Sequence, residues 1–223
     1  KHNQVVAFYL YKKKKFEKQE AQKWWVSKSL SEFRKGLLKL NINLEVIEVE
    51  SYNSFFEKLF KKKNFSFYWN KTYEPNYLKF DKFLIKNFNN FGISYKIFKG
   101  NILNEVGEVK KSDGTPFKVF TPFWRNAETF YFEKIPSNEK KISKCSKKVS
   151  FFRNTINENI ICPKNDWYKK IEKYWIPSEE NALKELKSFI SNRIENYANA
   201  RNFPSTCGTS KLSPFIKHGQ LHV

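Results

Sequence analysis

The chain has 223 residues, of which 40% are hydrophobic and 18% aromatic, so it can fold around a core and is not a disordered chain. No apolar run approaches the roughly 20 residues of a membrane span, and no signal peptide opens the sequence. The net charge of +20 indicates a polyanionic partner. Nearly all the cations are Lys, however, and a compositional bias toward Lys, Asn, Phe, Ile and Tyr explains them equally well.

The first hundred residues alternate between two kinds of segment. Short apolar runs predict β-strands at 5–11, 44–50, 65–70 and 93–99. Amphipathic segments predict helices at 19–40, 51–62 and 76–91, and Gly92 stands where a helix end requires positive φ. This alternation predicts an α/β fold with a doubly wound parallel sheet, in which ligands bind beyond the carboxyl ends of the strands. Neither GxGxxG nor GxxxxGK[ST] is present, which excludes the ordinary dinucleotide and P-loop sites.

The second half of the chain predicts a linker and a helix. Residues 134–176 lose periodicity and read as a linker that crosses to a second domain. Apolar residues at helical spacing predict one long helix over 177–204, ended by Pro204. We therefore expect an α/β domain at 1–133, the linker, and the start of an all-helical domain at 177–223.

The cysteines and histidines give weaker signals. Cys145, Cys162 and Cys207 are widely spaced and form no CxxC pair, which favours free thiols in a reducing cytoplasm over a disulfide framework. His218 and His222 are four residues apart, as two metal ligands on a helix would be. No third ligand follows nearby, so we expect no metal site.

The terminal stretch GTSKLSPFIKHGQL combines small hydroxyl residues with one cation. Gly208 permits an unusual backbone angle, and Ser213 and Pro214 suit the N-cap and first position of a helix. Hydroxyls, the ammonium of Lys211 and the free N–H groups of a helix start would bind a phosphate. A capped helix start without a ligand explains the same residues.

Four segments in order carry a family resemblance: YEPN, KVFTPFWR, WIPSEENALKELKSFI, and YANARNFP followed by GTSKLSPFIKHGQL. Together they resemble the DNA photolyase/cryptochrome family. The resemblance implies an α/β domain with an optional antenna pigment, a long linker, and an all-helical domain that holds FAD. The sequence has no Met and opens directly on an apolar run, so we expect a piece of a longer protein, inactive by itself.

The resemblance also assigns site residues. It implies that Tyr197 contacts FAD and that one segment grips the FAD phosphates, namely Thr209, Ser210, Lys211, Leu212 and Ser213. Many members have Arg where Lys211 stands, and Lys lacks the planar fork of Arg. Arg201 would contact the DNA backbone. Asn76 matches a position that touches a folate antenna in some members, although a helix N-cap explains it as well.

The implied activity is light-dependent repair of cyclobutane pyrimidine dimers in DNA by electron transfer from excited reduced FAD. FAD would be the cofactor, a second antenna chromophore would be methenyltetrahydrofolate or deazaflavin, and the partner would be damaged double- or single-stranded DNA. We expect a monomer that does not bind membranes. We also expect this chain to contain no general acid, base or nucleophile. Two alternatives stay open: a cryptochrome-type blue-light photoreceptor, and a flavin-free basic nucleic-acid-binding protein.

Overall fold

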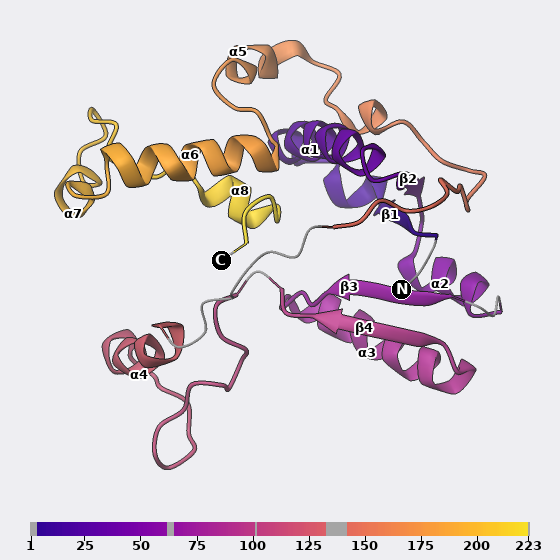
Figure 1. Ribbon diagram of the computed structural model, residues 1–223, viewed down its shortest axis with the longest axis horizontal. Helices are drawn as coiled ribbons and strands as arrows, with labels where there is room; N and C mark the ends of the chain where they lie inside the picture. Colours follow the sequence, from indigo (N-terminus) through magenta and orange to yellow (C-terminus); the bar gives the residue numbers. More distant parts are fainter. Residues whose placement is uncertain (1–3, 62–64, 101, 133–141, 223) are drawn as a thin grey trace. The chain divides into compact units, whose positions relative to one another are not determined.

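The computed structural model describes residues 4–61, 65–100, 102–132 and 142–222 (Figure 1). These residues form two compact units. Lys1–Lys63 and Ser143–His222 make the first unit, and Asn64–Ile142 make the second. None of the helices in these ranges is long and apolar enough to cross a membrane.

The first unit opens with a parallel strand pair. Its elements are β1 (Val6–Tyr11), η1 (Lys13–Phe16), α1 (Glu20–Leu38), β2 (Asn43–Glu48) and α2 (Tyr52–Phe60). β1 and β2 pair in parallel, with Val6 opposite Asn43 and Tyr11 opposite Glu48. α1 makes the crossover that a parallel pair requires. Val46 is fully buried in the core between these elements.

The second unit repeats the same plan with β3 (Ser66–Asn70), α3 (Pro75–Phe91), β4 (Ser94–Phe98) and α4 (Phe120–Phe132). β3 and β4 are parallel and pair from Ser66 with Ser94 to Asn70 with Phe98. Gly92 ends α3 with φ 65°, as expected of a left-handed helix cap. The fully buried ring of Phe88 stacks on Phe67 at 4.8 Å between centroids.

The α/β prediction is confirmed, and each predicted strand and helix within residues 5–99 is present with ends that differ by at most two residues. The strands are parallel, as the alternation of strands and helices requires. Within the described ranges they form two separate two-stranded sheets, β1–β2 and β3–β4.

The segment that was expected to be a linker has its own short helices and lies against β2. η2 (Glu158–Ile161), η3 (Asp166–Tyr168) and α5 (Lys169–Glu172) fall within it, and residues 134–141 lie outside the described ranges. The buried carboxylate of Glu45 accepts the N–H groups of Phe151 and Phe152 at 2.7 and 2.8 Å. These bonds hold the segment at one place along β2.

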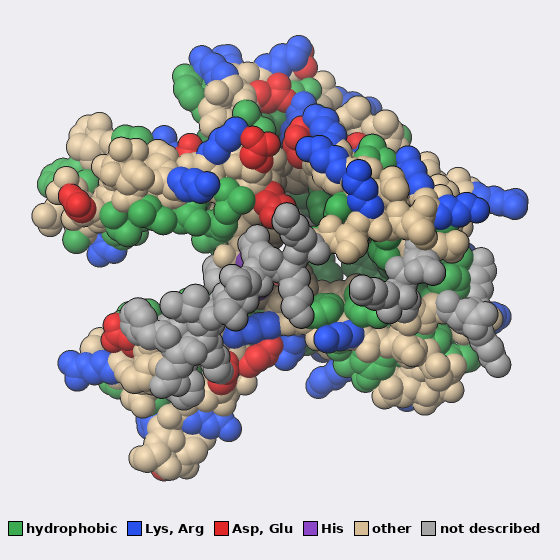
Figure 2. All heavy atoms as spheres, viewed as in Figure 1, with side chains coloured by type: hydrophobic (Ala, Val, Ile, Leu, Met, Phe, Trp, Pro, Cys, Tyr) green, Lys and Arg blue, Asp and Glu red, His purple; other side chains and the backbone are tan. Residues whose placement is uncertain are grey.

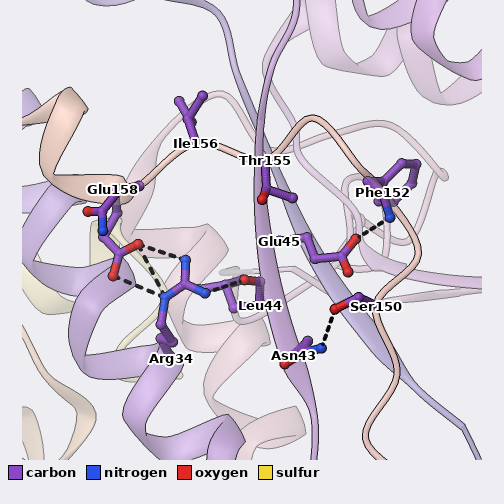
Figure 3. Close-up of a pocket in the computed structure, with 10 residues that line it drawn as sticks. Arg34, Asn43, Leu44, Glu45, Ser150, Phe152, Thr155, Ile156 and Glu158 are labelled. Carbon is purple, nitrogen blue, oxygen red and sulfur yellow. Dashed lines mark hydrogen bonds and ion pairs between the residues drawn. The ribbon is translucent and has the colours of Figure 1, made fainter.

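A second contact fixes the same segment to α1 (Figure 3). Arg34 donates from Nη2 to Glu158 Oε2 at 2.7 Å, and its Nε lies 3.1 Å from Glu158 Oε1. A cavity of about 440 Å³ lies beside this pair and Glu45. Burial is the largest single influence and would raise the pKa of Glu158. The hydrogen bonds from Arg34, a backbone hydrogen bond and the charge of Arg34 together outweigh burial, so the pKa lies below its ordinary value.

The last part of the chain holds three helices: α6 (Glu179–Asn192), α7 (Tyr197–Ala200) and α8 (Ser213–Lys217). Ser178 caps α6, because its hydroxyl accepts the N–H of Asn181 at 3.1 Å. The prediction of one helix over 177–204 is wrong, since α6 ends after Asn192. Asn192 is a poor helix former, and its amide bonds the carbonyl of Ser188 at this point.

The predicted apolar face of α6 is only partly buried. Ala182 is fully buried, whereas Leu183 and Ile190 are 43% and 52% exposed. Figure 2 shows hydrophobic side chains along the surface of α6. The buried end of α6 joins an aromatic cluster with Trp24 and Trp25 of α1 and Phe215 of α8. This cluster packs α6 and α8 against α1, the helix that connects β1 and β2.

We predict that Arg34→Met lowers the free energy of unfolding by about 2–4 kcal/mol at neutral pH, because it leaves the Glu158 carboxylate buried without its guanidinium partner. Urea unfolding measures this loss. A folded pKa below the ordinary value means that the Glu158–Arg34 contribution is complete above about pH 4.3 and is lost as the pH falls through the folded pKa. The difference between wild type and variant should therefore shrink in acid.

Arg153→Met is the matched control, because Arg153 lies exposed on the same segment. Its unfolding free energy should stay within about 0.5 kcal/mol of the wild type. Equal losses in the two variants would show that the Arg34–Glu158 pair does not hold the segment.

Candidate functional site

The loop between α7 and α8 is anchored by a close backbone approach. A Cβ on Gly208 would lie 2.5 Å from the carbonyl carbon and oxygen of Ala200, so the position requires glycine. Just before it, the Thr206 hydroxyl donates to the carbonyl oxygens of Ala200 and Phe203 at 3.1 and 2.9 Å. The start of the loop is therefore held against the end of α7.

The structure corrects the expected reason for this glycine. Gly208 does not have positive φ; the left-handed residue of the loop is Lys211, with φ 56°. A non-glycine residue in this region costs on the order of 1 kcal/mol. Gly208 is needed instead because its backbone packs against Ala200.

Three of the next five residues expose polar side chains to solvent. Thr209, Lys211 and Ser213 are exposed, and among the described residues their side chains take part in no hydrogen bond or ion pair. Ser210 is half-buried, and its hydroxyl lies 3.4 Å from the N–H of Leu212. Leu212 is buried at 7% exposure. The loop thus combines an apolar anchor with hydroxyl and ammonium donors that have no partner in the described part of the chain, which is suitable for an anionic group.

The expected cap of the following helix is also corrected. Ser213 is the first residue of α8, and Leu212 occupies the N-cap position without a side-chain hydrogen bond. α8 has only five residues, so its dipole adds little to anion binding. Any attraction for a phosphate at this loop comes from Thr209, Lys211 and Ser213 themselves.

Two further predicted site residues lie at α7, with Tyr197 as its first residue and Arg201 directly after its last. The ring of Tyr197 meets Phe189 edge-on at 5.5 Å between centroids. The guanidinium carbon of Arg201 lies 5.5 Å from the centroid of the Tyr197 ring. Arg201 is exposed and forms no ion pair with the described residues. Because Gly208 packs on Ala200 of the same helix, the structure brings Tyr197 and Arg201 into one site with the loop.

Asn76 belongs to the second unit. It is exposed near the start of α3, where Glu74 holds the N-cap position and Pro75 follows. The alternative reading of Asn76 as a helix N-cap is therefore wrong. Its possible contact with an antenna chromophore stays a prediction.

Sequence reasoning missed a polar cluster close to Asn76 in the chain. Tyr73 donates from its hydroxyl to Glu105 at 2.7 Å, and Lys71 pairs with the other carboxylate oxygen at 2.9 Å. Hydrogen bonds from Tyr73 and Lys71 hold the pKa of Glu105 below its usual value. Gly100 lies directly against the carbonyl of Lys71. The glycine after a predicted strand was the one signal that could have indicated this close approach.

Comparison with known proteins decides the family. A protein-family model described as DNA photolyase matches residues 1–140 of this chain. The chain belongs to the DNA photolyase family. The family resemblance inferred from the four segments is confirmed.

Two relatives and one solved structure show how far the likeness extends. The deoxyribodipyrimidine photo-lyase of Agrobacterium fabrum is 27% identical over 217 residues, covering 97% of this chain and 45% of the relative. Cryptochrome-2 of Arabidopsis thaliana is 25% identical, covering 91% of this chain and 34% of the relative. The crystal structure of a class III photolyase from Agrobacterium tumefaciens superposes with a TM-score of 0.78 at 25% identity, covering 97% of this chain and 45% of that one. This chain therefore spans less than half the length of these photolyase family members.

For this photolyase family chain we predict that Gly208→Ala lowers the free energy of unfolding by about 1–3 kcal/mol, because the added methyl group forces the loop away from α7. Thermal and urea unfolding measure the loss. Gly36→Ala is the matched control, because Gly36 lies in α1 and an added methyl group there would have no atom within 4 Å. This control should gain about 0.5–1 kcal/mol. Similar gains in both variants would contradict the close approach at Gly208.

Proposed function

We propose that this protein repairs cyclobutane pyrimidine dimers in DNA in a light-dependent reaction, as a deoxyribodipyrimidine photo-lyase that uses FAD. The observation that carries the proposal is the loop Thr209–Ser213. The hydroxyls of Thr209 and Ser213 and the ammonium of Lys211 have no partner among the described residues. The loop is anchored beside Tyr197 and Arg201 in a chain of the DNA photolyase family.

The loop has the donor chemistry that the diphosphate of FAD requires. Thr209, Ser210 and Ser213 would donate hydroxyl hydrogen bonds to phosphate oxygens, and Lys211 would place its charge beside them. Leu212 would contribute by anchoring the loop through its buried side chain. Tyr197 would contact the flavin from α7. When bound, FAD supplies the light-driven electron transfer to the dimer, and the residues of this chain bind and orient it.

Arg201 and the net positive charge of the chain support DNA as the partner. The Tyr197 ring lies beside the guanidinium of Arg201, which holds this cation in a preferred direction. We propose that Arg201 contacts a DNA phosphate and that the general positive charge of the chain adds a non-specific attraction. Double-stranded and single-stranded damaged DNA are both proposed substrates.

Other features of the proposed protein follow from the family. We propose the division into an α/β domain at 1–133, a linker at 134–176 and a helical FAD domain that begins at 177. Asn76 would contact a second chromophore, methenyltetrahydrofolate or deazaflavin. Cys145, Cys162 and Cys207 are free thiols, which supports a cytoplasmic location. We propose a monomer, since the proposed reaction needs one flavin site.

A cryptochrome-type photoreceptor is the second candidate, because the likeness to Cryptochrome-2 also covers nearly all of the chain. The two functions share the flavin site and differ in whether dimers are repaired. The deciding experiment irradiates purified, reduced protein with dimer-containing DNA and counts dimers before and after. Light-dependent loss of dimers is expected. Bound FAD without any repair would favour the photoreceptor, and protein with neither FAD nor repair would leave a basic nucleic-acid-binding protein.

The double variant Thr209→Ala, Ser213→Ala should lower FAD affinity by about 100-fold or more, because each of the two lost hydrogen bonds to a charged phosphate is worth about 1.5–3 kcal/mol and each step of about 1.4 kcal/mol is tenfold. The ratio of flavin absorbance to protein absorbance after purification measures retention. Ser191→Ala, Ser205→Ala is the matched control, since both serines are exposed outside Thr209–Ser213. Unchanged flavin content in the loop variant would contradict its phosphate role.

Arg201→Ala should weaken binding to damaged DNA and reduce the slope of log affinity against log salt by about 1, because one phosphate contact is lost. Fluorescence anisotropy of labelled DNA over a salt series gives both quantities. Arg153→Ala removes an equal charge from an exposed position on another segment and should change the slope less. If the two variants behave alike, Arg201 acts only through net charge.

A further inference from the structure

One glutamine ties the turn after α8 to α1. The amide of Gln220 accepts the indole N–H of Trp25 at 3.1 Å and donates from Nε2 to the hydroxyl oxygen of Ser29 at 2.9 Å. The Ser29 hydroxyl in turn donates to the backbone carbonyl of Trp25 at 2.7 Å. The three residues close a ring of hydrogen bonds, and 195 positions of sequence separate Trp25 from Gln220.

The ring uses each group in the sense its chemistry permits. An indole N–H only donates, an amide has one acceptor and one donor end, and a hydroxyl both donates and accepts. The indole N–H of Trp25 needs an acceptor, so it must face the oxygen of the Gln220 amide. The amide of Gln220 therefore fits in one orientation only. Such a network of directional bonds in a partly buried place fixes the relative position of the elements that contribute to it.

The same indole also holds α8 by aromatic contact. Trp25 is 6% exposed, and its ring meets the fully buried ring of Phe215 edge-on at 5.2 Å between centroids. It stacks on His218 at 5.8 Å and 26°. Burial, with a smaller effect of Lys217, lowers the pKa of His218 to about 4, so the stacked imidazole is neutral at neutral pH.

Backbone bonds connect this ring to the helix and hence to the loop. The N–H groups of Gln220 and Leu221 both lie within bonding distance of the Phe215 carbonyl, at 2.9 and 3.3 Å. Leu212, the last residue of the loop before α8, is buried in the same cluster as Trp25 and Phe215. A shift of Gln220 would therefore move α8 and, with it, the end of the loop.

The loop Thr209–Ser213 thus has two anchors, Gly208 on Ala200 at its start and α8 on Trp25 at its end. We propose that Trp25, Ser29 and Gln220 are positioning residues that keep this loop in the conformation that binds the diphosphate of FAD. The inference rests on the proposed function of the loop. It assigns a part in flavin affinity to α1, the helix between β1 and β2, although the residues proposed to contact FAD lie at α7 and in the loop.

The test compares FAD with riboflavin, which has the same ring system but no phosphate. Dissociation constants of both are measured for the purified protein by equilibrium dialysis. Ser29→Ala removes one of the two bonds between Gln220 and α1, together with the bond from Ser29 to the Trp25 carbonyl, and leaves the aromatic contacts intact. Gln220→Ala removes both bonds between Gln220 and α1. Because a net hydrogen bond corresponds to about fivefold in affinity, the preference for FAD over riboflavin should fall about fivefold in Ser29→Ala and further in Gln220→Ala, with riboflavin affinity unchanged.

Gln22→Ala is the matched control. Gln22 also lies on α1, and its side chain forms no hydrogen bond with the described residues; its variant should keep the wild-type preference. An unchanged preference in Ser29→Ala and Gln220→Ala, or an equal loss of both ligands, would overturn the inference. Wild-type protein that does not prefer FAD over riboflavin would instead overturn the proposed phosphate role of the loop.

Discussion

The buried carboxylate of Glu45 is the constraint on which the arrangement of the first unit depends. A carboxylate inside a fold is stable only when donors satisfy it, and its donors are the backbone N–H groups of Phe151 and Phe152. The chain after residue 142 must therefore return to β2 at this point. The carboxylate of Glu158, further along the same segment, is also buried and is satisfied by Arg34 of α1. Together they set where α5 and α6 begin relative to α1.

Because the chain returns in this way, residues from both ends of the sequence shape the candidate flavin site. α6, α7 and α8 carry Tyr197, Arg201 and the loop, while α1 supplies the indoles against which α6 and α8 pack. Short elements such as α7, with four residues, and α8, with five, are not stable as isolated helices. Their conformation in this chain comes from tertiary contacts. A site built in this way is sensitive to substitutions on α1, far from the residues that would touch a ligand.

The strands and helices before residue 100 could be predicted because their signals are local. Apolar periodicity and the C-terminal Gly92 of α3 act within a few residues, and each element appeared where they indicated. The loop residues could be named through the resemblance, but their geometry could not be predicted. Gly208 is constrained by Ala200 and not by its own φ, and Ser213 is not a cap because Leu212 turns inward to the aromatic cluster. Neither contact leaves a pattern in neighbouring residues. The polar ring around Gln220 joins residues 195 positions apart, a relation that no local pattern encodes.

α7 connects the two binding roles proposed for this chain. Within its single turn and the next residue lie Tyr197, facing the proposed flavin, Ala200, on which Gly208 rests, and Arg201, the oriented cation proposed for DNA. A displacement of α7 would move all three residues together, because a helix of four residues is too short to bend within itself. Flavin and DNA affinities should then be thermodynamically linked, each ligand raising the affinity for the other by the same factor. The many solvated lysines cannot produce such a link, since their attraction for DNA is long-ranged and does not depend on the position of α7. The coupling therefore separates the oriented contact of Arg201 from the general positive charge of the chain.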